Sequence, residues 1–156
     1  MATSPHTTLH DELALIDALI DLMKQEQQCL VAADTDTLAS LTPVKTAHIS
    51  QLALLAGQRH AALAGAGLPG SEAGMDSWLA AKNEPAMQAV WQEALARMRE
   101  AKELNRVNGM LINKQMTHNQ NLITAMRTPA DAADMGVYGP KGQTSSANNK
   151  RPLVVG

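Results

Sequence analysis

The sequence is poor in aromatic residues and in cysteine, and both shortages narrow what the chain can be. Its 156 residues include no Phe, one Tyr, two Trp and a single cysteine, Cys29. One thiol cannot close a disulfide within the chain, and no histidine lies near it to complete a metal site. With few large aromatic anchors, the hydrophobic 45% of the chain is expected to pack through many small contacts. The abundance of Ala favours an all-α protein, because Ala is the strongest helix former.

An excess of charge of one sign is also missing. The formal net charge is −2, so no positive excess indicates nucleic acid or an anionic membrane as a partner. The N-terminal region lacks a basic segment, and acidic residues interrupt its apolar part, so neither a signal peptide nor membrane insertion is expected. We therefore expect a cytoplasmic protein with one domain, because a chain of this length suffices for one core.

Side chains that could perform chemistry are present but are not grouped. His6 and His10 are four residues apart, yet they straddle an expected helix start, and no further ligands are spaced to complete a metal site. Residues 65–70 have the glycine spacing of a dinucleotide-binding turn, but they follow an Ala-rich helix rather than a strand. No Ser or Cys has a base placed beside it. We therefore expect neither an enzyme nor a cofactor.

Residues 83–127 predict one long amphipathic helix. Asn83 suits the N-cap, and Pro85 suits the first turn, where a missing N–H costs nothing. At 1.5 Å per residue, a helix of this length would span about 64 Å, so we expect an elongated molecule. Apart from a gap around Asn119, its apolar or small residues recur at three- and four-residue steps, as in a coiled-coil seam: Met87, Val90, Ala94, Met98, Ala101, Leu104, Asn108, Leu111, Gln115, Leu122 and Met126.

Two long helices are expected before it. Thr8, with Asp11 three residues later, resembles a capping box and predicts a helix start near Leu9. Asp34 or Asp36 is expected to end this helix or to cap the next one. The second helix should run to about residue 64.

Proline and glycine residues interrupt the helical pattern in the middle of the chain. Pro43 removes one hydrogen bond from the second helix, which predicts either a kink or a restart capped by Thr42. Residues 65–76 contain four glycines and a proline, which predict a loop. Asp76 could then cap a short helix over residues 77–82, in which Trp78 would cover one end of the bundle.

The two ends differ from the middle. Residues 1–8 are polar and are expected to be disordered, whereas residues 128–156 contain three prolines and a Ser/Asn run, which predicts a flexible tail. Residues 9–127 are expected to form an elongated, coiled-coil-like antiparallel three-helix bundle with a very long third helix. The expected core residues are Leu13, Ile16, Ile20, Leu52, Leu55, Val90 and Leu104.

Several residues within the long helix are poor helix formers, among them Asn105, Asn108, Gly109 and Asn119. In one interpretation, the polar seam residues fix the register of helix pairing, and Gly109 permits a close helix contact. In the other, this half of the helix exposes a mixed polar and Met/Leu surface that a helix of another protein occupies. Both interpretations fit the residues.

Four features of the chain are specific: a connection over residues 26–36, Trp78, the stretch LNRVNGMLI at residues 104–112, and a tail motif formed by Tyr138, Gly139, Pro140 and Gly142. Together they resemble the FlgN family of flagellar type III export chaperones. Pro43 and the high Ala content depart from the family pattern.

The resemblance implies a cytoplasmic, non-enzymatic chaperone. It would bind the C-terminal regions of its client proteins, the hook–filament junction proteins FlgK and FlgL, through residues 109–156. A tail tyrosine would contact the export gate protein FlhA. The residues expected to contact clients are Asn108, Gly109, Leu111, Ile112, Gln115, Asn119, Leu122, Ile123 and Met126. Those expected to dock at the gate are Tyr138, Gly139 and Pro140.

A different class of protein also fits the long seam. The chain could be a structural coiled-coil module that oligomerises along residues 83–127 without clients. The chaperone hypothesis expects at most weak self-association, whereas the structural module would assemble constitutively. Measuring molecular size against concentration distinguishes the two hypotheses.

Overall fold

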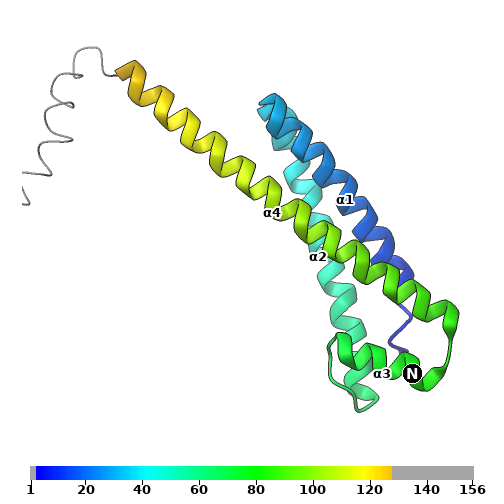
Figure 1. Cartoon of the computed structure of the whole chain (residues 1–156). Helices are drawn as coiled ribbons and strands as arrows, with labels where there is room; N and C mark the ends of the chain where they lie inside the picture. Colours follow the sequence, from blue (N-terminus) through cyan, green and yellow to red (C-terminus); the bar gives the residue numbers. More distant parts are fainter. Residues whose placement is uncertain (1–2, 128–156) are drawn as a thin grey trace, which may run out of the picture. The chain divides into compact units, whose positions relative to one another are not determined.

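The computed structural model describes residues 3–127, which form four α-helices and no strand (Figure 1). The all-α class is therefore confirmed. The helices are α1 (Leu9–Ala32), α2 (Thr35–Gly65), α3 (Glu72–Lys82) and α4 (Pro85–Arg127). The long helix is thus the fourth rather than the third. The contacts divide the chain into two units, with the boundary after Ile112, inside α4. The predicted bundle domain, residues 9–127, stays a prediction.

α1 begins at Leu9 as predicted, but Thr8 does not form the expected capping box. The Thr8 side chain caps no backbone N–H. Its hydroxyl donates instead to a carboxylate oxygen of Glu12 at 2.8 Å. Of the two predicted cap candidates, Asp34 caps α2 by accepting a hydrogen bond from the backbone N–H of Thr37 at 3.2 Å. Hydrogen bonding by the Thr37 side chain, and then by its backbone N–H, lowers the pKa of the Asp34 carboxyl.

α2 continues through Pro43 without interruption. The Thr42 hydroxyl donates to the Leu38 carbonyl at 3.1 Å, within the helix, so Thr42 does not cap a new one. The predicted restart is therefore wrong, since a proline removes only one backbone hydrogen bond and α2 continues past it.

α3 is longer than the predicted short helix because it starts earlier. Ser71 caps it by accepting a hydrogen bond from the Gly74 N–H at 3.1 Å. The loop is correspondingly reduced to residues 66–71. Asp76, the predicted cap, instead accepts a hydrogen bond from the indole N–H of Trp91 at 2.8 Å.

The junction between α3 and α4 also corrects a predicted cap. Asn83 ends α3 in a left-handed conformation, with φ of 54°. Asn adopts this conformation more readily than most residues, so it suits a helix C-terminus as well as an N-cap. Pro85 is the first residue of α4, as its fixed φ favours.

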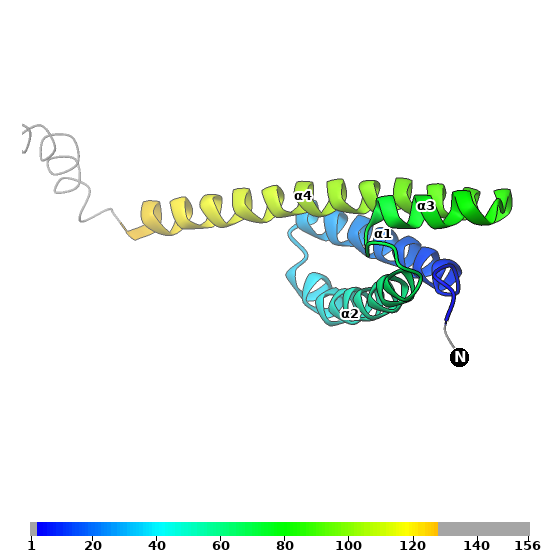
Figure 2. The same cartoon turned by 90° about the horizontal axis from the view of Figure 1, so that it is seen from below.

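Within the first unit, α1 lies between α2 and the first part of α4 (Figure 2). α1 and α2 are antiparallel, since Glu12 pairs with Arg59 and Glu26 with Lys45. α1 and α4 run in the same direction (Figure 1), because α2 returns the chain to the end of the first unit at which α1 begins, and α3 lies at that end.

The core forms two clusters along α1. Of the predicted core residues, Ile16, Ile20 and Leu55 are buried. The other four, Leu13, Leu52, Val90 and Leu104, are half-buried and pack at the cluster edges. The first cluster contains Leu9, Leu63, Met75, Trp78, Leu79, Trp91, Ala94 and Leu95. The second contains Ile16, Leu19, Ile20, Met23 and Ala101.

Residues 3–8, which were expected to be disordered, form a turn against the first cluster. The Thr7 N–H donates to the Ser4 carbonyl at 3.0 Å, and Pro5 is buried. The His6 ring stacks on Trp78, with 5.1 Å between the ring centroids. Trp78 therefore orders this segment, which polarity alone did not predict. The predicted flexible tail, residues 128–156, lies outside the described residues.

Candidate functional site

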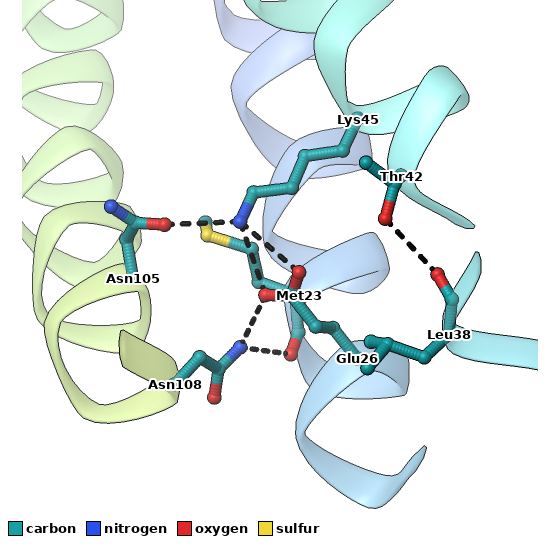
Figure 3. Close-up of polar contacts among 7 residues, drawn as sticks. All are labelled: Met23, Glu26, Leu38, Thr42, Lys45, Asn105 and Asn108. Carbon is teal, nitrogen blue, oxygen red and sulfur yellow. Dashed lines mark hydrogen bonds and ion pairs between the residues drawn. The ribbon is translucent and has the colours of Figure 1, made fainter. Parts of the chain in front are cut away.

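A polar cluster joins α1, α2 and α4 in the first unit (Figure 3). Lys45 Nζ donates to both carboxylate oxygens of Glu26, at 3.1 and 3.2 Å, and to Asn105 Oδ1 at 3.0 Å. Asn108 Nδ2 donates to the Met23 carbonyl and to Glu26 Oε1, both at 2.8 Å. Because Asn108 is only 1% exposed, its amide fixes the pairing of α4 with α1.

This geometry separates the two interpretations of the polar residues in α4. Asn108 was expected to contact clients, and the structure places it inside the bundle, bonded to α1. The suggested role of Gly109 is wrong, because a Cβ added there would meet nothing within 4 Å. A close helix contact therefore does not require this glycine.

The neighbouring candidates Leu111 and Ile112 differ in exposure. Leu111 is half-buried and lines a groove of about 480 Å³ with Val107 of α4 and with three residues of α1, namely Gln27, Gln28 and Val31. Ile112 is exposed. Leu111 therefore belongs to the α1–α4 contact region, whereas Ile112 faces solvent.

Four apolar side chains on residues 113–127 are exposed, and we call them the distal apolar face: Met116, Leu122, Ile123 and Met126. Their exposed fractions lie between 47% and 72%. Residues 116, 119, 123 and 126 are separated by three, four and three positions, so they share one side of the helix. Residue 122 adjoins them. The face is therefore an apolar stripe that Asn119 interrupts.

The charge around this face differs from the net charge of the chain. α4 contains no acidic residue after Glu103. Arg106 donates to Glu103 at 2.7 Å, which lowers the pKa of that carboxyl and raises the pKa of the guanidinium. Residues 113–127 carry Lys114 and Arg127 without any carboxylate. The surroundings of the distal apolar face are therefore uncharged or cationic.

Leu122, Ile123, Met126 and Asn119, which were expected to contact clients, occupy exposed positions of α4. Gln115 is half-buried. Met116 is 63% exposed and was not among the predicted contacts, because the predicted seam runs through Gln115. The steps of four from Ile112 to Met116 and of three to Asn119 would have indicated it.

Residues 3–127 contain no group of three or more His, Cys, Asp or Glu side chains that could bind a metal ion. None of the helices in this part of the chain is both long and apolar enough to span a bilayer.

The architecture places the chain among all-α proteins with an exposed apolar helix face. A family model described as "FlgN protein" matches residues 1–146. The chain therefore belongs to the FlgN family, whose members are flagellar export chaperones and are not known as enzymes. Neither the curated proteins nor the solved structures yield a significant match.

Proposed function

We propose that the protein is a cytoplasmic chaperone that binds junction proteins of the FlgK and FlgL type through the distal apolar face and delivers them to the type III export gate. The observation that supports this proposal is the exposure of Met116, Leu122, Ile123 and Met126. An exposed apolar stripe on a helix favours binding to the apolar face of a partner helix. The family membership supports a flagellar client.

The chemistry of the face suits a helical client. Burying a large apolar side chain contributes roughly 1.5 to 3 kcal/mol when it starts fully exposed, so four half-exposed chains contribute several kcal/mol before the entropy of association is subtracted. Asn119, and Gln115 one turn before it, are proposed as polar contacts within the stripe. Met side chains adapt to different partner surfaces, which suits a chaperone with two clients.

Replacing Leu122 and Met126 together with Glu tests the surface. We expect the double variant to lose capture of C-terminal FlgK or FlgL segments in a calorimetric titration, because two carboxylates would be buried in the complex. Its melting temperature should match that of the parent, since both side chains are exposed in the free protein.

Val44 and Leu54 of α2 provide a matched control, because both are exposed apolar helix residues. Replacing this pair with Glu makes the same change in charge and hydrophobicity away from the proposed surface. Client affinity should then remain at the parent value. Equal affinity of the Leu122/Met126 variant and the parent would remove the distal apolar face from consideration.

The proposal assigns gate docking to Tyr138, with Gly139 and Pro140, all of which lie outside the described residues. The support is the resemblance of this tail motif to the family's, together with the tendency of aromatic anchors to dominate small interfaces. Tyr138→Ala should leave client affinity unchanged and weaken binding to FlhA, whereas Tyr138→Phe should retain most of it. Undiminished FlhA binding and export by the Ala variant would contradict the assignment.

An exposed apolar helix face also fits a second copy of the chain, so a structural oligomerisation module remains the alternative function. Sedimentation of the free protein over a range of concentrations distinguishes the two. The chaperone proposal predicts a species that associates weakly and releases its self-contacts when client is added. A stable oligomer unaffected by client would favour the structural module.

A further inference from the structure

The methionines of this chain lie in sharply different environments. Met116 and Met126 are 63% and 72% exposed, whereas Met23 and Met75 are 2% and 0% exposed. A thioether is converted to the sulfoxide by two-electron oxidants, and its susceptibility follows solvent access. The exposed pair therefore meets an oxidant in solution directly, and the buried pair is protected by the core.

We propose that Met116 and Met126 are a reversible oxidation site through which peroxide lowers the affinity of the distal apolar face for its client. The consequence for the client rests on the proposed function, whereas the oxidation itself does not. In the reaction, a sulfur lone pair attacks one peroxide oxygen, the O–O bond breaks, an S–O bond forms and water leaves. Methionine loses two electrons and hydrogen peroxide is reduced to water.

Met110 shows that exposure is not the only determinant of reactivity. It is 58% exposed, but its Sδ accepts a hydrogen bond from Arg106 Nη1 at 3.0 Å. Glu103 holds the same guanidinium through two further bonds, at 2.7 and 3.0 Å. The engaged lone pair is a weaker nucleophile, so Met110 should oxidise more slowly than Met116, although their exposures are similar.

The positions of the two reactive sulfurs explain the effect on binding. Residues 116 and 126 share one side of α4, and ten residues of helix separate them by about 15 Å. Sulfoxides at both positions would place polar oxygens near both ends of the stripe. An apolar client helix would bury these oxygens without hydrogen-bond partners, which lowers affinity by about tenfold for each sulfoxide.

The experiment treats the full-length chain with hydrogen peroxide and follows each methionine by peptide mass spectrometry. We expect Met126 and Met116 to react first, Met110 to follow more slowly, and Met23 and Met75 to react last. The oxidised chain should bind a C-terminal FlgK or FlgL segment about 10- to 100-fold more weakly than the untreated chain. Methionine sulfoxide reductases should restore the affinity.

Two variants isolate the pair. For Met116→Leu/Met126→Leu, the affinities before and after peroxide should be equal, because no reactive sulfur remains on the face. Met110→Leu should retain the full loss on oxidation. Uniform oxidation of exposed and buried methionines, or unchanged affinity of the oxidised parent, would overturn the inference while the untreated titration still supports the proposed function. No binding by the untreated chain would refute both.

Discussion

At the scale of single residues, the ion pair between Glu12 and Arg59 illustrates how charge is stabilised inside this small core. Only 3% and 5% of the two side chains are exposed, and two nitrogens of Arg59 donate to Glu12 at 3.1 to 3.3 Å. Thr8 donates a further hydrogen bond to Glu12, and the guanidinium lies 4.9 Å from the Trp91 ring centroid. The pair is therefore satisfied from several elements, and removing one partner leaves a buried charge.

Arg59→Met should destabilise the protein by about 3 to 5 kcal/mol, because the Glu12 carboxylate loses its counter-charge inside the core. Chemical denaturation measures the change in the free energy of unfolding. Arg97→Met is the matched control: Arg97 forms three surface ion pairs at 3.5 to 3.8 Å and should change stability by no more than about 0.5 kcal/mol. Similar effects of the two substitutions would contradict the account of the buried pair.

The asparagines of α4 show what single residues reveal before the structure is known. The sequence identified Asn105, Asn108 and Asn119 as unusual within a helix. It could not distinguish their roles, because the partner of Asn108 is the carbonyl of Met23, distant in sequence. Asn119 has the same propensity and lies exposed. Only the contacts between α1 and α4 show that Asn108 packs inside the bundle, whereas Asn119 is a candidate client-contact residue.

At the scale of elements, α3 depends on one close approach. A Cβ added at Gly74 would lie 1.9 Å from the Pro69 carbonyl oxygen. Gly74 therefore allows the loop to fold against the first turn of α3, where its N–H reaches Ser71. Gly74 was predicted to lie in the loop, because glycine usually interrupts helices. Nothing in the neighbouring sequence indicates that the Pro69 carbonyl approaches it.

Gly74→Ala should destabilise the protein by about 1 to 3 kcal/mol, since backbone must move to relieve the clash. Gly57→Ala in α2 is the control, because a Cβ there would meet nothing within 4 Å. That substitution should stabilise the protein by about 0.5 to 1 kcal/mol through helix propensity. Denaturation of both variants checks the opposite signs, and a stabilised Gly74→Ala protein would refute the proposed role of the glycine.

Helix ends were predictable where one residue type has one clear role. Leu9 and Pro85 were identified as helix starts from the sequence, whereas Asp34 was one of two candidates with Asp36. Ser71 and Asn83 were not assigned correctly, because Ser, Asp and Asn suit several positions around a helix end. The tertiary partner decides among them, as Trp91 does when it engages Asp76.

At the scale of the whole molecule, the fold class and the family followed from the sequence. The all-α class came from Ala content and periodicity, and the family from residues 104–112 and the tail motif. The contact boundary at Ile112 falls within a continuous helix, so no helix end marks it in the sequence. Periodicity predicts which side of α4 is apolar, but contacts with other helices determine where that side is covered.

The central claim is that a client helix binds the distal apolar face of α4. Amide hydrogen exchange of the full-length chain, with and without a C-terminal FlgK or FlgL segment, tests this claim most directly. The account predicts that client slows exchange across residues 113–127 and leaves exchange in α1 and α2 at the free-protein rate. Slower exchange confined to α1 and α2, or no change in residues 113–127 at saturating client, would contradict it.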